Sequence, residues 1–137
     1  MVYASGKIVE DLATLYWQRY RTPLFISETA ASGSFLRRRE WLDQSIEAVQ
    51  RTRAAGIPLI GYTWWPLFAL VTWAYRQGLH PPNYYLKQMG LWDLDSDLRR
   101  IPTSLVQSYQ DLVCRGTEAV GTLADTFVAG PPVEIGK

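Results

Sequence analysis

Two short uncharged runs, at residues 23–27 and 57–62, constrain the fold of this chain most. Both are too short for a helix and are apolar on both faces, which is typical of parallel strands covered by helices on each side. Helical patterns precede each run. The resulting order of helix, strand, helix, strand predicts an α/β fold.

Two helices are expected before these strands. The first spans residues 5–20, and the second spans residues 35–55, where Ser34 suits the N-cap and Gly56 the C-terminal stop. The apolar face of the first helix consists of Ile8, Leu12, Leu15 and Tyr16. The basic run Arg37, Arg38 and Arg39 is expected on a solvated face of the second.

The second half of the chain has weaker patterns. A short helical turn is expected at residues 71–77 and a short extended segment at 89–94. Pro102 suits the first position of a third helix, which we expect to reach Arg115 and to stop at Gly116. We therefore expect one domain, at residues 1–126, and a flexible tail at residues 127–137.

Composition excludes several classes of protein. With 47% hydrophobic and 20% charged residues the chain is globular, and a net charge of +1 argues against a nucleic-acid partner. Residues 54–75 are uncharged, but Pro58, Gly61 and Pro66 interrupt them, so we expect no membrane span. Cys114 is the only cysteine, which fits a cytoplasmic protein.

Metal and cofactor sites are not expected. Asp93, Asp95 and Asp97 mimic the start of a calcium loop, but Leu98 stands where that loop needs glycine and Ser104 where it needs glutamate. There is no Cys/His cluster and no glycine-rich phosphate loop.

Glu28 is the main candidate for a functional residue, because it lies where the first predicted strand opens into a polar loop. In (β/α) proteins catalytic residues stand at that edge of the sheet. Alternatively, the carboxylate is paired with an arginine. Trp64, Trp65 and Trp73 are further candidates, either as rings that stack on sugars or as core or interface residues.

The order of several motifs is more specific than any one of them. They are I-S-E-T at residues 26–29, G-I-P-L-I-G-Y at 56–62, W-P-L at 65–67, Trp73, M-G-L-W-D at 89–93 and R-I-P-T-S at 100–104. This series resembles the C-terminal portion of the family-one retaining glycoside hydrolases, the β-glucosidase-like (β/α)₈ TIM barrels. Their strand seven ends in I-T-E-N-G, and strand eight reads G-Y-x-x-W-S-L-L-D-N-F-E-W.

The resemblance, over about residues 23–109, implies roles for individual residues. Glu28 matches the catalytic nucleophile, Trp65 the aromatic platform beside the sugar, and Trp73 the tryptophan that contacts sugar hydroxyls. A cis peptide bond is implied between Trp65 and Pro66. Thr72 stands where the family has a glutamate, and Thr29-Ala30 replace Asn-Gly, so the chain resembles a divergent branch.

The resemblance also implies that the chain is incomplete as an enzyme. A (β/α)₈ barrel needs about 250 residues, and the family's acid/base glutamate follows strand four. We therefore expect a carbohydrate substrate for the whole protein, no glycosidase activity for these 137 residues alone, and self-association through the exposed barrel edge. The alternative is a non-enzymatic remnant or interaction module.

Overall fold

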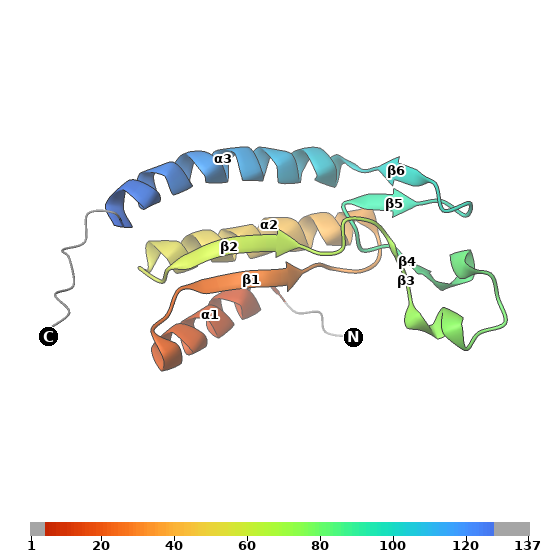
Figure 1. Ribbon diagram of the computed structural model, residues 1–137, viewed down its shortest axis with the longest axis horizontal. Helices are drawn as coiled ribbons and strands as arrows, with labels where there is room; N and C mark the ends of the chain where they lie inside the picture. Colours follow the sequence, from red (N-terminus) through yellow and green to blue (C-terminus); the bar gives the residue numbers. More distant parts are fainter. Residues whose placement is uncertain (1–4, 128–137) are drawn as a thin grey trace, which may run out of the picture. The chain divides into compact units, whose positions relative to one another are not determined.

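The computed structural model describes residues 5–127, in two compact units that divide after Thr103. The first unit contains α1 (Lys7–Tyr20), β1 (Leu24–Thr29), α2 (Phe35–Ala54), β2 (Leu59–Trp64), β3 (Leu70–Val71), the 3₁₀ turns Trp73–Arg76 and Pro82–Tyr85, β4 (Leu86–Lys87), β5 (Trp92–Leu94) and β6 (Arg100–Pro102). The second contains α3 (Ser104–Phe127). Figure 1 labels the α-helices and the strands.

The strands β1 and β2 run parallel, as predicted, with Leu24 opposite Leu59 and Ile26 opposite Tyr62. The helix α2 connects them, which confirms the predicted order of helix, strand, helix and strand. The described residues form three two-stranded sheets, and they contain no closed barrel. The mixed α/β class is therefore confirmed.

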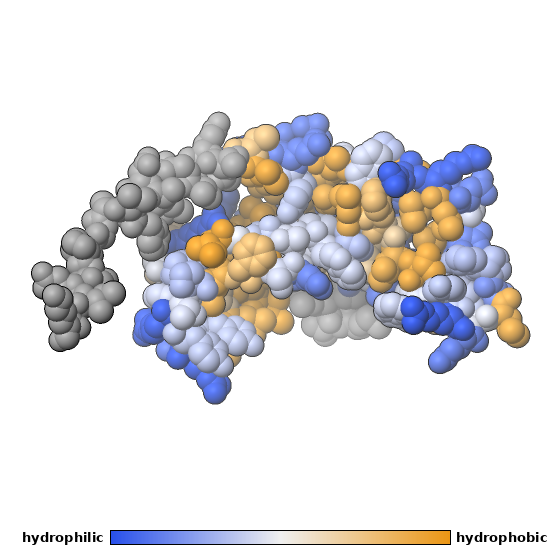
Figure 2. Space-filling model, in the orientation of Figure 1, coloured by the Kyte–Doolittle hydropathy of each residue, from blue (hydrophilic) through white to orange (hydrophobic). Residues whose placement is uncertain are grey.

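The core of the first unit lies between one face of β1–β2 and the two helices α1 and α2. Buried Ala13, Val49 and Leu59 form its centre. The partly buried residues around them are Val9, Leu24, Ile26 and Tyr62. We had expected both faces of the strands to be buried, and this was wrong, because Phe25 is 58% and Ile60 60% exposed. Apolar side chains accordingly reach the surface over β1 and β2 (Figure 2).

The helix α1 packs with a different face from the one its periodicity suggested. Val9 and Ala13 contact the core, whereas Ile8, Leu12, Leu15 and Tyr16 are 44–57% exposed. The helix is thus apolar on two adjacent sides, and only one of them is covered within the first unit.

Local signals set the ends of α2 as predicted. The hydroxyl of Ser34 accepts a hydrogen bond from the backbone N–H of Arg37 at 3.4 Å. Gly56, directly after the C-cap residue Ala55, has φ +78°, a left-handed conformation that favours glycine. The chain can therefore turn at once into β2.

Arg38 corrects the prediction of a solvated basic face, because it is only 1% exposed. It shares the buried side of α2 with Leu42 and Ser45. Its Nη1 donates to the Asp93 carboxylate (2.6 Å) and to the Gly90 carbonyl (2.8 Å), and its Nη2 donates to the other Asp93 oxygen (3.1 Å). A buried guanidinium needs such partners, so this ion pair ties α2 to β5.

The β5–β6 hairpin is closed by Asp95. One oxygen of its carboxylate accepts the backbone N–H groups of Asp97 (2.9 Å) and Arg99 (2.8 Å). Leu98 adopts φ 62° within this turn. Asp95 therefore holds the turn, whereas Asp93 pairs with Arg38. Within residues 5–127 no group of three or more His, Cys, Asp or Glu side chains could hold a metal ion.

The helix α3 differs from its prediction at both ends. Pro102 belongs to β6, so the helix begins at Ser104, and it continues through Gly116 to Phe127. A glycine inside a helix costs only about 1 kcal/mol relative to alanine and need not end it. Of the predicted tail, residues 128–137 lie outside the described part of the chain. No described helix is both long and apolar enough to span a bilayer.

Candidate active site

The carboxyl ends of β1 and β2 meet and bring Glu28 and Trp65 onto neighbouring segments. Thr29 pairs with Trp64 across the two strands. The backbone N–H of Trp65 then donates to the carbonyl of Thr29 at 3.1 Å. In parallel α/β architectures this edge is where side chains from different strands converge on a ligand.

The carboxylate of Glu28 is exposed, at the penultimate position of β1. Among residues 5–127 it has no hydrogen bond and no ion pair. The alternative of a strand-end carboxylate paired with an arginine is therefore not met in the described residues. An unpaired carboxylate in this place is free to meet a ligand.

Trp65 follows β2 directly, and its peptide bond to Pro66 is cis, as predicted. Its side chain is 45% exposed. A half-exposed indole at the end of a strand leaves ring surface available for stacking.

Trp64 is a core residue, in agreement with the alternative that the sequence left open for it. It is 5% exposed, and its indole N–H donates to the Met89 carbonyl at 3.1 Å. Trp64 is the last residue of β2, and alternation along the strand turns it away from the surface that Trp65 occupies.

Trp73 opens the 3₁₀ turn after β3 and is 72% exposed. The guanidinium of Arg76 lies 4.2 Å from the centre of its ring. The preceding residue, Thr72, is fixed by its backbone N–H, which donates to the Tyr85 carbonyl at 3.0 Å. No hydrogen bond or ring contact among the described residues joins Trp73 to Glu28 or Trp65.

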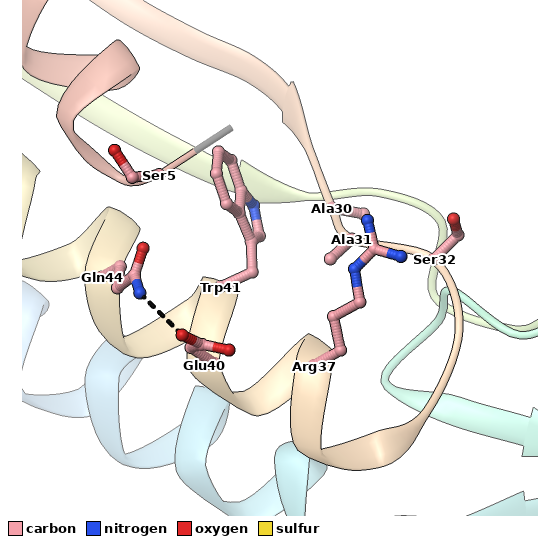
Figure 3. Close-up of a pocket in the computed structure, with 8 residues that line it drawn as sticks. All are labelled: Ser5, Ala30, Ala31, Ser32, Arg37, Glu40, Trp41 and Gln44. Carbon is pink, nitrogen blue, oxygen red and sulfur yellow. Dashed lines mark hydrogen bonds between the residues drawn. The ribbon is translucent and has the colours of Figure 1, made fainter. Parts of the chain in front are cut away.

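Trp41 supports the end of β1 from the helix side, a role that the sequence did not reveal. Its indole N–H donates to the Thr29 hydroxyl at 2.9 Å. Beside it lies a cavity of about 400 Å³ between Ser5, the loop at residues 30–32 and α2. In Figure 3 the Arg37 side chain extends toward that loop, and Glu40 accepts a hydrogen bond from Gln44 (3.0 Å).

Other carboxylates of α1 and α2 form ion pairs of their own. Asp43 pairs with Arg39 (2.9 Å) on the exposed side of α2. Glu10 pairs with Arg51 (3.0 Å) between α1 and α2. None of these groups shares a hydrogen bond or ion pair with Glu28 in the described part of the chain.

Comparison with known proteins gives a consistent result for the fold. No family model matches the sequence, and no curated protein matches it. A solved β-glucosidase from Thermotoga maritima, in complex with glucoimidazole, matches 81% of this chain with a TM-score of 0.67 and 20% identity. A β-glycosidase from Thermosphaera aggregans matches 81% of this chain with a TM-score of 0.68 and 22% identity. A psychrophilic β-glucosidase from Micrococcus antarcticus matches 81% of this chain with a TM-score of 0.67 and 23% identity.

The matches include only a small part of each of the three solved proteins. The chain covers 26%, 22% and 25% of the three proteins, respectively. The resemblance to family-one β-glucosidases is thereby confirmed at the level of fold. The chain spans only about one quarter of the length of these proteins.

Proposed function

We propose that this chain is the C-terminal portion of the (β/α)₈ barrel of a retaining glycoside hydrolase. In this proposal β1 and β2 correspond to strands seven and eight, and Glu28 is the nucleophile. The observation that carries it is the unpaired Glu28 carboxylate at the carboxyl end of a parallel strand, beside the cis Trp65–Pro66 bond of the next strand. The β-glucosidase-like fold supports it.

The chemistry requires a second carboxyl group. In a retaining mechanism the two groups stand about 5–5.5 Å apart across the scissile bond. Glu28 would attack the anomeric carbon and form a glycosyl-enzyme ester while the second group protonates the departing oxygen. Water, deprotonated by that second group, would then release the sugar. This acid/base would come from polypeptide outside these 137 residues.

Two tryptophans would define the sugar site in this proposal. Trp65 would stack on the sugar ring, because the residue is 45% exposed and its backbone is bonded to Thr29, the residue after Glu28. Trp73 would approach sugar hydroxyls once the site is complete. Thr72, in place of a glutamate, offers a neutral hydroxyl there, so recognition of those hydroxyls would be weaker than in a standard β-glucosidase.

A second candidate function is a non-enzymatic interaction module that keeps the shape of the half-site. The absence of a carboxylate partner for Glu28 among the described residues favours it, together with the substitution at Thr72. The two candidates differ in whether Glu28 matters for turnover when the remainder of a barrel is supplied.

A chimera distinguishes them. The matched quarter of the Thermotoga maritima β-glucosidase is replaced by this chain, and hydrolysis of an activated aryl glucoside is measured. The proposal predicts turnover that falls at least about a thousandfold in Glu28→Gln. The matched control, Glu40→Gln, changes an exposed glutamate of α2 and leaves turnover unchanged. A folded chimera whose turnover is insensitive to Glu28→Gln would contradict the proposal.

A further inference from the structure

The last residues of β1 break the alternation of buried and exposed side chains that a regular strand shows. The first four residues alternate, but Ser27 and Glu28 are both exposed, and Thr29 is again partly buried. In a regular strand Glu28 would share the face of Ile26, two positions before it. Ile26 packs against the core. The break therefore keeps the Glu28 carboxylate out of the core.

A β-bulge accounts for this break. Ile26 of β1 pairs with Tyr62 of β2, and the next pair is Thr29 with Trp64. The strand β1 thus advances three residues, from 26 to 29, where β2 advances two, from 62 to 64. Such an extra residue re-aims a side chain, and bulges are common beside active sites. Because of it Thr29, rather than Glu28, takes the side of the helices.

The bulge is held at Thr29 from two directions. The indole N–H of Trp41, in α2, donates to the Thr29 hydroxyl at 2.9 Å. The Thr29 carbonyl accepts the backbone N–H of Trp65 at 3.1 Å. In Figure 3 the Trp41 indole extends from α2 with its nitrogen on the side of Ala30, the residue that follows Thr29. Since the Glu28 carboxylate has no hydrogen bond of its own among residues 5–127, its position follows that of Thr29.

We propose that Trp41 is a positioning residue for Glu28. Its hydrogen bond to Thr29 maintains the bulge, and the bulge keeps the Glu28 carboxylate at the exposed carboxyl end of β1. Without the bond Thr29 loses its partner on the helix side, and β1 returns toward regular pairing, which turns Glu28 toward the core. The effect of Trp41 on the strand does not depend on the proposed function, whereas its effect on catalysis rests on it.

Amide hydrogen exchange of the full chain, followed by NMR, tests the link between Trp41 and the strand. Trp41→Phe removes the indole donor, and Thr29→Val removes the hydroxyl acceptor. Each should speed exchange of the Trp65 amide about tenfold, the effect of losing one ordinary hydrogen bond. The Leu24 amide, which donates to the Pro58 carbonyl at the other end of the two strands, should exchange at an unchanged rate.

Two further variants serve as controls. Thr29→Ser keeps the hydroxyl and should retain slow exchange at Trp65. Trp17→Phe changes another partly buried tryptophan, in α1, and should behave as wild type. Unchanged exchange at Trp65 in Trp41→Phe and Thr29→Val would overturn the inference. Equal acceleration at Leu24 would also overturn it, because the two strands would then have loosened as a whole.

The chimera described above tests the consequence for catalysis. Trp41→Phe and Thr29→Val should each lower kcat for the aryl glucoside about ten- to a hundredfold with little change in KM, because a misplaced nucleophile slows the chemical step more than it weakens binding. The double variant should resemble either single variant, since both remove the same bond. Thr29→Ser should recover most of the loss.

Azide separates positioning from a general structural effect. In a Glu28→Gly chimera azide attacks the anomeric carbon in place of the carboxylate, the aryl oxygen leaves, and a glucosyl azide forms. Trp41→Phe should leave that rate unchanged, because no carboxylate remains to be positioned. An equal loss of rate with azide would overturn the positioning role. Turnover insensitive to Glu28→Gln would instead contradict the proposed function, and the exchange rates would still decide whether Trp41 holds the strand.

Discussion

The Arg38–Asp93 pair makes the sharpest prediction about stability, because its two partners are buried unequally. The Arg38 side chain is 1% exposed and that of Asp93 26%. Asp93→Ala removes both carboxylate bonds and leaves the guanidinium with the Gly90 carbonyl as its remaining partner. Removal of one partner from a buried pair costs about 3–5 kcal/mol, since the other charge stays buried and uncompensated.

Arg38→Met should lower the free energy of unfolding by less than Asp93→Ala does. The methionine fills part of the volume with apolar atoms, and the partly exposed Asp93 carboxylate regains water. The loss is then that of the hydrogen bonds, about 1–2 kcal/mol. The double variant, Arg38→Met with Asp93→Ala, should resemble Arg38→Met alone. The coupling energy between the two sites then equals the whole effect of Asp93→Ala, about 3–5 kcal/mol.

Urea unfolding followed by far-UV circular dichroism measures these differences. The midpoint should fall much further for Asp93→Ala than for Arg38→Met, with similar denaturant slopes. The exposed pair Arg39–Asp43 is the matched control, and Asp43→Ala should change stability by less than about 1 kcal/mol. If Asp93→Ala and Arg38→Met cost the same, or if the two changes are additive, the reasoning from unequal burial is refuted.

Three further predictions concern Gly61, Asp95 and the activity of the isolated chain. Gly61→Ala should destabilise the chain by about 1–3 kcal/mol in urea unfolding, because a Cβ there overlaps the Phe25 ring, and Phe25→Leu should restore part of the loss. Asp95→Ala should speed hydrogen exchange at the Arg99 amide and cost about 1–2 kcal/mol, and unchanged exchange would show that the turn forms without its carboxylate. The isolated chain should show no turnover of an aryl glucoside, and a signal abolished by Glu28→Gln would disprove that expectation.

Features set by local chemistry could be predicted from the sequence. Ser34 and Gly56 mark the ends of α2 because an N-cap hydroxyl and a left-handed glycine act within a few residues. The parallel pairing of β1 and β2 follows from two short apolar runs joined by a helix. The cis Trp65–Pro66 bond followed from the resemblance rather than from composition.

Features that depend on distant partners could not be predicted. Arg38 stands among three consecutive arginines, and the partner that allows its burial is 55 positions away. Its place on the buried side of α2, four residues before Leu42, was the one available signal. Periodicity predicted one apolar face of α1, the one with Leu12 and Tyr16, whereas the first unit covers the side that carries Val9 and Ala13.

The function of Glu28 is tested most directly by trapping it. A 2-deoxy-2-fluoroglucoside with a good leaving group reacts with the chimera described above, because the fluorine slows release of the glycosyl-enzyme more than its formation. Peptide mass spectrometry then locates the adduct. The account predicts one fluoroglucosyl ester on Glu28, at the carboxyl end of β1, and none in Glu28→Gln. An active chimera labelled on another residue, or left unlabelled, would contradict it.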